Sequence, residues 1–212
     1  MPSVSIVIPA KDAAATIEAT LRSLIDQDGV DEILLVNDGS HDNTVDIANR
    51  LHDERIQILH GPANGIAAAL NTGFAAAKGE CVARCDADDL FAPGRIVRQA
   101  EWLDAHPGFI AIAGGFATIT RNGNKVADLA ARGAGFDATN RVLHGETFIH
   151  FGAWLTRAKA LKQVGGARTW FETGEDLDLQ FRLAACGAVW YDPEIAYIYR
   201  LHDRSITHRQ GR

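Results

Sequence analysis

The chain has 212 residues, of which 47% are hydrophobic and 23% charged, and its formal net charge is -6. This size and composition are typical of one globular domain with a sizeable buried core. The acidic balance gives no electrostatic basis for binding nucleic acid. No stretch approaches the roughly 20 apolar residues that a membrane-spanning helix needs. We therefore expect neither a nucleic-acid partner nor a membrane span.

The cysteines and the chain ends indicate a cellular compartment. Three cysteines are too few and too sparse for a disulfide framework, and Cys85, in an apolar run, is predicted to be buried. The N-terminus lacks the basic and long apolar regions of a signal peptide, so we expect a cytoplasmic protein. Arginines near the C-terminus would allow peripheral association with the inner face of the cell membrane, although a solvated tail is the favoured explanation of them.

Strands and helices are predicted to alternate through the first half of the chain. Short apolar runs indicate buried strands, and apolar residues at helical spacing indicate the helices between them. The expected strands are residues 4–8, 32–36, 56–59 and 81–85, and the expected helices are residues 13–25, 44–51, 66–77 and 95–105. This alternation is typical of a parallel sheet, in which ligands bind beyond the carboxyl ends of the strands.

The second half of the chain is predicted to contain mainly strands. The expected strands are residues 109–120, 125–129, 148–156, 189–191 and 195–199. A helix is predicted over residues 175–185 and is stopped by Gly187 in the C′ position. We see no linker or internal repeat, and therefore expect one domain in two lobes.

The sharpest local feature is the segment Asp86-Ala87-Asp88-Asp89, which directly follows the fourth expected strand. Carboxylates this close repel one another, so a cation should compensate them. Mg²⁺ and Mn²⁺ take oxygen ligands and are commonly shared between one or two carboxylates and a substrate phosphate. A solvated acidic loop with Asp89 capping a turn is the alternative.

Other polar residues admit both a functional and a structural interpretation. Asp38 could accept a hydrogen bond from the imide of uracil, or could belong to a simple turn. Asp176, after Glu175, could be a general base, or both could merely suit a helix N-terminus. His150 could be a core histidine, and His202 could contact a metal or diphosphate or be incidental.

Taken together, these segments resemble family 2 glycosyltransferases with the GT-A fold, and the match runs nearly end to end. The matching positions are Val4–Asp12, Val36–Ser40, Asp42, Asn64-Gly65, Asn71, Gly73, Gly79, Ala83–Asp89, Pro93, Arg95, Gln99, His150, Gly165-Gly166, Glu175–Leu179, Arg182, Tyr199-Arg200, His202 and Ser205. Each motif is weak alone, but their order and spacing together are specific. The acidic segment is closest to the metal-binding segment of bacterial surface-polysaccharide members.

The resemblance implies an α/β GT-A fold: a mostly parallel, Rossmann-like central sheet flanked by helices, with a smaller acceptor-side sheet. Residues 1–105 would be the nucleotide-sugar-binding half and residues 106–212 the acceptor-binding half. The implied catalytic base is Asp176, supported by Glu175. The implied substrate contacts are Pro9, Ala10, Asp12, Asp38, Asn64, Arg84, Asp86, His150 and His202. The implied ligands of Mg²⁺ or Mn²⁺ are Asp88, Asp86 and His202.

The resemblance also implies a reaction, which is inverting transfer from a nucleotide-diphosphate sugar, with UDP-hexose expected first. The acceptor would be a glycan, lipid-linked or protein hydroxyl in cell-surface glycan synthesis. Two positions depart from the pattern, since Asp12 stands where many members carry asparagine and Asn37 where many carry aspartate. A catalytically degenerate nucleotide-sugar-binding module stays open as an alternative. A sugar-phosphate nucleotidyltransferase would need a glycine-rich loop where residues 9–13 contain no glycine.

Overall fold

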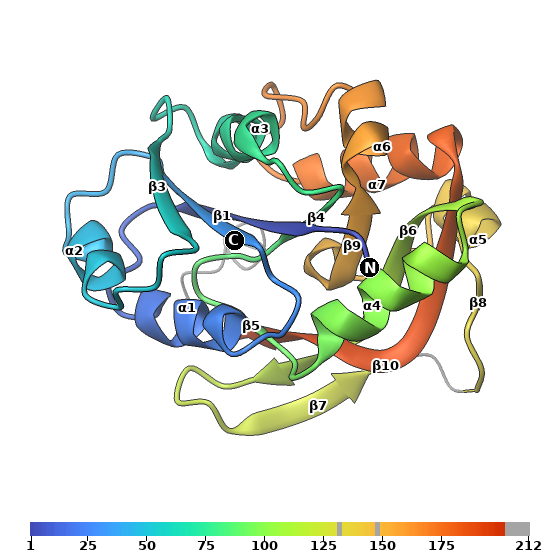
Figure 1. Cartoon of the computed structure of the whole chain (residues 1–212), viewed down its shortest axis with the longest axis horizontal. Coiled ribbons are helices and arrows are strands. Elements are labelled where there is room, and N and C mark those ends of the chain that lie inside the picture. Colours follow the sequence, from blue (N-terminus) through green and yellow to red (C-terminus); the bar gives the residue numbers. More distant parts are fainter. Residues whose placement is uncertain (131–132, 147–148, 202–212) are drawn as a thin grey trace, which may run out of the picture.

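The computed structural model describes residues 1–130, 133–146 and 149–201. Its strands form one ten-stranded sheet with helices on both faces, as Figure 1 shows. The main path through the sheet is β3-β2-β1-β4-β9-β6-β10-β5, with β7 paired to β6 and β8 paired to β10. The expected α/β class is therefore confirmed.

The first half of the chain supplies four parallel strands. They are β1 (Val4–Ala10), β2 (Glu32–Asn37), β3 (Ile56–His60) and β4 (Cys81–Arg84). The helices of this half are α1 (Ile17–Ile25), α2 (Thr44–Asn49), α3 (Ile66–Ala76) and α4 (Arg95–Ala105). The chain runs outward from β1 to β3 and then returns to β4 on the other side of β1. This reversal makes the carboxyl ends of β1 and β4 a topological switch point, where α/β sheets bind ligands.

The rest of the chain extends the same sheet, beginning with β5 near the end of the first half. Its strands are β5 (Leu90–Phe91), β6 (Phe109–Ile119), β7 (Lys125–Leu129), β8 (Phe136–Asp137), β9 (Trp154–Arg157) and β10 (Ala188–Arg200). Its helices are α5 (Thr139–Leu143), a 3₁₀ turn η1 (Phe151–Ala153), α6 (Ala158–Gln163) and α7 (Glu175–Cys186). Strand β9 lies antiparallel between β4 and β6 and joins the two halves. The smaller C-terminal group of strands is thus continuous with the central sheet.

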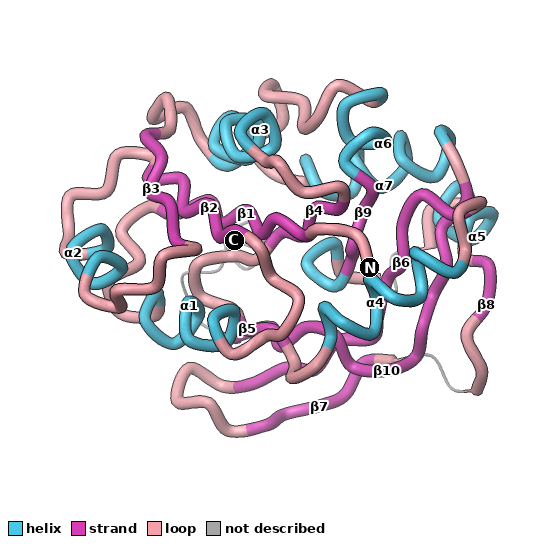
Figure 2. The backbone as a smooth tube through the Cα atoms, viewed as in Figure 1, coloured by secondary structure: helices cyan, strands magenta, loops and turns pink. Residues whose placement is uncertain are grey.

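Two hydrophobic cores cover the two faces of the sheet. Ile6 and Ile8 of β1 pack in the core that contains α1 and α4, whereas Val7 packs in the core that contains α3, α6 and α7. This division follows from the alternation of side chains along a strand. Figure 2 shows the helices above and below the sheet accordingly. Within the described ranges, no helix is both long and apolar enough to cross a membrane.

Two predicted features of the second half are wrong. The strand expected over residues 148–156 begins only at Trp154, because η1 precedes it. His150 Nδ1 accepts a hydrogen bond from the Gly152 amide, and a Cβ at Gly152 would lie 2.4 Å from the ring of Tyr197. The strands expected at 189–191 and 195–199 are one strand, β10, whose register shifts between Asp192 and Ile195. Strands β5 and β8 and helices α5 and α6 were not predicted.

Glycine and cysteine positions in the core have simple packing reasons. Gly187 does end α7, but its φ of 177° is extended rather than left-handed. A Cβ there would lie 2.6 Å from Ile110, so close packing requires the glycine. Cys81 and Cys85 are fully buried, which confirms the expectation for Cys85, and burial raises the pKa of the Cys81 thiol to about 11.

Candidate active site

The ends of β1 and β2 meet at the carboxyl edge of the sheet. Pro9 and Ala10, two of the expected substrate contacts, are the last residues of β1, and both side chains are buried. The Ala10 carbonyl accepts a hydrogen bond from the Asp38 amide at 2.8 Å. The strands therefore place Asp38 directly beside the end of β1.

The carboxylate of Asp38 is only 4% exposed. Its Oδ2 accepts from the Gly65 amide at 3.0 Å, whereas its buried Oδ1 has no hydrogen-bond partner among the described residues. Gly61 flanks this oxygen so closely that a Cβ there would lie 2.7 Å from it. Buried acceptors without a donor are uncommon in folded proteins, so this oxygen marks a candidate binding point.

Asp12 fastens the loop after β1 to the loop after β2. Its Oδ1 accepts from the His41 amide at 2.7 Å, and its own amide donates to Ser40 Oγ at 3.0 Å. The backbone of Asp12 has a positive φ of 50°, which aspartate and asparagine tolerate better than most residues. The contact to His41 uses only an acceptor oxygen, which both residue types possess. The structure thus accommodates aspartate at this position.

Arg84 joins the end of β4 to the start of α7. The buried guanidinium donates from Nε to Asp86 Oδ1 at 2.7 Å and from Nη1 to Glu175 Oε1 at 3.0 Å. Burial opposes its charge, but Asp86 and Glu175 outweigh burial and raise the pKa of Arg84. The expected substrate contact Arg84 is therefore engaged between two acidic segments, and its partner Glu175 lies 91 residues further along the chain.

Asp89, the last residue of the acidic segment, is a structural carboxylate. It is fully buried, and it accepts from the Tyr197 hydroxyl at 2.8 Å and from the Arg200 amide at 2.7 Å. Burial, together with Asp88 and Asp86, raises the pKa of Asp89 well above its usual value. The Tyr197 hydroxyl also accepts from the Asp86 amide at 3.1 Å. No local pattern in the sequence indicated that Tyr197 and β10 hold this loop.

Some of the side-chain atoms near Asp86 are suited to bind a divalent cation. Ligating atoms of Asp86, Asp89 and His150 lie within 4.8 Å of one another. Both oxygens of Asp89 already accept protein hydrogen bonds. The carboxylates of Asp86 and Asp88, both half-buried, have the oxygen chemistry that Mg²⁺ and Mn²⁺ prefer. His202, the third expected ligand, lies outside the described residues.

His150 is better suited to donate a hydrogen bond than to bind a metal. Its ring stacks on Tyr197 with centroids 4.8 Å apart, and its Nδ1 accepts from the Gly152 amide at 3.0 Å. Burial lowers the pKa of His150, so the ring is neutral near pH 7. In a neutral imidazole whose Nδ1 accepts, Nε2 carries the hydrogen. His150 therefore presents an N–H donor near Asp86.

The first two residues of α7 differ in their surroundings. Glu175 is 5% exposed and paired with Arg84, and burial raises its pKa despite that pairing. Asp176 is half-buried, and its Oδ1 accepts from the Leu177 amide at 2.9 Å. Glu175 is thus held within the protein, and Asp176 is the more accessible carboxylate at the start of α7.

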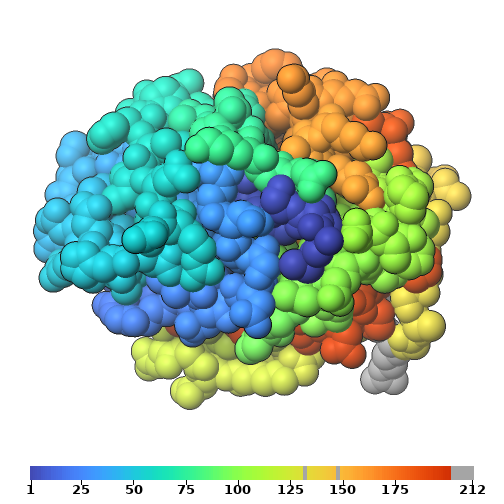
Figure 3. All heavy atoms as spheres, in the orientation of Figure 1, coloured from blue at the N-terminus to red at the C-terminus, as the bar shows by residue number. Residues whose placement is uncertain are grey.

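A set of hydrogen bonds fixes the segment that leads toward α7. Asn71 of α3 donates to the Ala167 carbonyl at 2.7 Å and accepts from the Ala167 amide at 2.8 Å. Arg182 of α7 donates to the carbonyls of Val164 and Gly166, at 2.7 and 2.8 Å. These contacts place three motif residues of the sequence, Asn71, Gly166 and Arg182, at one junction between α3 and α7. Figure 3 shows the green-cyan surface around α3 against the orange surface of the segment that precedes α7.

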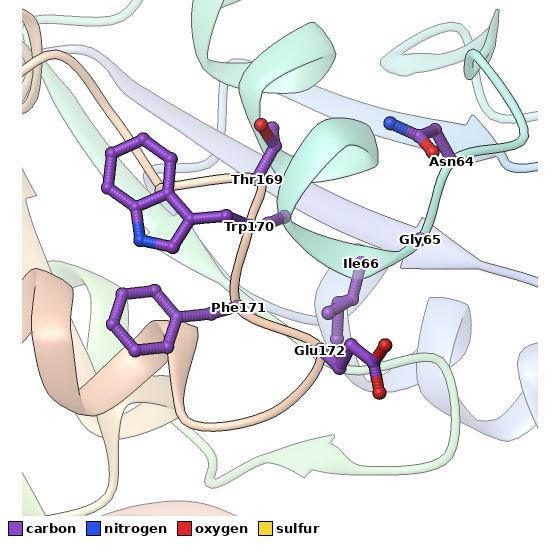
Figure 4. Close-up of a pocket in the computed structure, with 8 residues that line it drawn as sticks. Asn64, Gly65, Ile66, Thr169, Trp170, Phe171 and Glu172 are labelled. Carbon is purple, nitrogen blue, oxygen red and sulfur yellow. The ribbon is translucent and has the colours of Figure 1, made fainter.

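A pocket of about 410 Å³ lies between the start of α3 and the loop that precedes α7. Figure 4 shows the residues that line it. They are Asn64, Gly65, Ile66, Ala67, Thr169, Trp170, Phe171 and Glu172. Of these, the sequence predicted only Asn64 as a site residue. The available signal was Trp170-Phe171, an aromatic pair in a polar stretch with no helical or strand periodicity.

Comparisons with known proteins agree with this architecture. The sequence profile described as "Glycosyl transferase family 2" matches residues 5–165. Chondroitin synthase of Pasteurella multocida is 31% identical over 207 residues, which cover 95% of this chain and 21% of that protein. The putative glycosyltransferase EpsE of Bacillus subtilis is 27% identical over 211 residues, which cover 96% of this chain and 74% of that protein.

A solved structure has the same fold at low sequence identity. S. aureus TarS 1-349 in complex with UDP-GlcNAc superposes with a TM-score of 0.80 and 18% identity, covering 94% of this chain and 59% of that one. This likeness shows that the chain has the GT-A fold. The chain spans about a fifth of the length of the Pasteurella chondroitin synthase that it matches.

Proposed function

Because the chain belongs to glycosyl transferase family 2, we propose that it is an inverting, metal-dependent enzyme that transfers the sugar of a UDP-hexose to an acceptor hydroxyl in cell-surface glycan synthesis. Residues 1–105 would bind the donor and residues 106–212 the acceptor. The names of similar proteins support this setting, since they include chondroitin synthase and the succinoglycan biosynthesis protein ExoO of Rhizobium meliloti.

The end of β2 would recognise the nucleobase. The buried Oδ1 of Asp38 lacks a donor among the described residues, and the imide N–H of uracil would supply one. The choice of uridine also draws on TarS, whose structures contain UDP and UDP-GlcNAc. Asp12 and Asn64 stand on the adjoining loops, where they would contact the nucleoside.

The acidic segment would hold the cation and the diphosphate. Asp86 and Asp88 would ligate Mg²⁺ or Mn²⁺, which when bound neutralises the charge of the departing nucleotide. The Nε2–H of His150 would donate to a diphosphate oxygen. Tyr197 of β10 holds the segment in place, since its hydroxyl bonds to the Asp86 amide and to the Asp89 carboxylate.

The start of α7 would supply the base. Asp176 would take the proton of the acceptor hydroxyl while that oxygen bonds to the anomeric carbon of the donor sugar. The bond from that carbon to the diphosphate oxygen breaks on the opposite face, and its electron pair leaves with UDP. The observation that carries this proposal is the bridge from Asp86 through Arg84 to Glu175, since it brings the cation segment and the base segment together.

The first test is thermal stabilisation by UDP, GDP and dTDP, each with and without Mn²⁺. A ligand that binds only the folded state raises the melting temperature. We expect a Mn²⁺-dependent rise with UDP that Asp88→Ala removes, followed by UDP release from a UDP-hexose when acceptor is supplied. UDP binding without any turnover, equal in wild type and Asp176→Asn, would favour a degenerate binding module. Release of pyrophosphate from UTP and a sugar 1-phosphate would identify a nucleotidyltransferase.

A further inference from the structure

Trp170 is the most exposed large hydrophobic side chain among the described residues, with 71% of its surface accessible. The ring centroid of Phe171 lies 6.3 Å away, and the guanidinium of Arg168 lies 5.4 Å from the indole centroid. Figure 4 shows the two aromatic rings next to each other on one side of the loop. Exposing an indole forgoes the stabilisation that burial would give, so this position suggests a binding role.

The loop that carries Trp170 starts from a fixed base. Its first residues, Gly166 and Ala167, are hydrogen-bonded to Arg182 and Asn71. The loop ends at Gly174, directly before Glu175, the first residue of α7. The start of the loop is therefore fixed, and the loop leads into the helix that carries the proposed base. A fixed support lowers the entropic cost of ordering the loop on binding.

The pocket lining combines aromatic faces with hydrogen-bonding groups. Trp170 and Phe171 supply the rings, and Asn64, Thr169 and Glu172 supply an amide, a hydroxyl and a carboxylate. A pyranose ring has a matching surface, with a face of C–H groups and an edge of hydroxyl groups. A volume of about 410 Å³ lies within the range of small-molecule sites.

We propose that this pocket binds a pyranose ring of the acceptor, which stacks on Trp170 while its hydroxyl groups bond to Thr169 or Glu172. The inference rests on the proposed function and narrows its acceptor to a carbohydrate. The proposed nucleobase contact, Asp38, does not line this pocket, although Gly65, which does, donates its amide to Asp38. The acceptor ring would approach Asp176 along the loop that leads into α7.

The test uses the full chain labelled with fluorotryptophan and saturated with UDP and Mn²⁺. The chain has four tryptophans, and the variant Trp170→Phe identifies the Trp170 signal in the fluorine NMR spectrum. Methyl α- and β-glycosides of glucose, galactose, mannose, N-acetylglucosamine and glucuronic acid are the probes. We expect at least one of them to shift the Trp170 signal saturably and leave Trp102, Trp154 and Trp190 unchanged.

Variants then distinguish stacking of the glycoside on Trp170 from a general effect of removing an exposed aromatic side chain. Trp170→Ala should weaken binding of that glycoside by about tenfold, and Trp170→Tyr should retain most of it, because an aromatic face remains. Phe181→Ala is the matched control, since Phe181 is an exposed aromatic residue outside the pocket. The affinity for UDP with Mn²⁺ should be the same in all of them.

Two results would overturn the inference. The first is that UDP binds but no glycoside shifts the Trp170 signal up to its solubility limit; the proposed function would then stand without this acceptor site. The second is that UDP alone shifts the Trp170 signal and Trp170→Ala lowers UDP affinity, which would assign the pocket to the donor. Absence of UDP binding would instead contradict the proposed function, while a saturable glycoside shift would still support the pocket.

Discussion

The acidic segment after β4 and the start of α7 are built alike but held differently. Each has a buried carboxylate, Asp89 or Glu175, next to a half-buried one, Asp88 or Asp176. Burial raises the pKa of both buried members. Asp89 is held by a hydroxyl and a backbone amide, whereas Glu175 is held by the guanidinium of Arg84.

This difference separates two tasks. The partners of Asp89 are uncharged groups of β10, so they fix the shape of one loop. Arg84 pairs with Glu175 and also with Asp86, so it fixes one acidic segment relative to the other. Substitutions among the partners of Asp89 should disturb the acidic segment alone. Substitution of Arg84 should disturb the position of the acidic segment relative to the start of α7.

The largest expected effect follows from removing Arg84. Arg84→Ala leaves two carboxylates without their cation, and breaking a buried pair costs about 3–5 kcal/mol of unfolding free energy. Arg98→Ala is the control, because its pair with Asp192 is partly exposed and should contribute about 0–1 kcal/mol. Urea denaturation measures both variants. Equal losses in the two would show that the Arg84 bridge does not organise the site.

The next effect concerns the base. Asp176→Asn should lower the rate of sugar transfer by about 10²-fold or more, since a positioned base typically contributes that much. The affinity for UDP with Mn²⁺ should stay unchanged, because the proposed donor contacts are untouched. Asp128→Asn, an exposed carboxylate of β7, should transfer at the wild-type rate. Normal turnover by Asp176→Asn would remove this residue from the mechanism.

A smaller effect is expected from the Tyr197 hydroxyl. Tyr197→Phe keeps the ring that stacks on His150 but leaves the buried Asp89 Oδ2 without its donor, which costs about 1–3 kcal/mol. Tyr199→Phe, on the same strand, removes a hydroxyl that has no hydrogen bond within the described ranges, and should be nearly neutral. Thermal or urea unfolding compares the two. A neutral Tyr197→Phe would contradict the role assigned to β10.

The smallest effect is a change in pH dependence. A native pKa of Glu175 above the ordinary 4.5 means that the folded state binds this proton more tightly than the unfolded chain does. Its contribution to stability is therefore present at low pH and is lost as the pH rises from about 4.5 through the native pKa. Glu175→Gln should lack this component when unfolding free energies are measured across that range. Parallel pH profiles for the two proteins would show that the pKa is not raised.

The sequence predicted elements with a clear local signal well, and elements that depend on distant partners poorly. Helix α4 and strand β7 have the predicted bounds, because each has a clear periodicity of its own. The turn η1 and strand β5 depend on partners far along the chain, such as the ring of Tyr197 against Gly152 and the pairing of Leu90 with Ile198. Local propensity carries no information about such partners.

The same limit applies to the site. The order of motifs identified the family and the candidate carboxylates, because the residue types themselves are informative. The sequence did not reveal that Arg84 bridges Asp86 and Glu175, nor that Asn71 holds Ala167. These contacts join segments that only the folded sheet brings together. The roles of Asp88 and Asp176 in chemistry stay predictions.

The position of β9 has a consequence for how the chain folds during synthesis. Strands β1 to β4 are all made before Trp154, yet in the described part of the chain the edge of β4 that faces away from β1 pairs with β9. A nascent chain halted before Trp154 should therefore expose the unpaired edge of β4, and limited proteolysis of such stalled chains would detect it. The central strands would thus leave the ribosome with one edge of β4 unpaired. Strand β9, which pairs with that edge, is synthesised later.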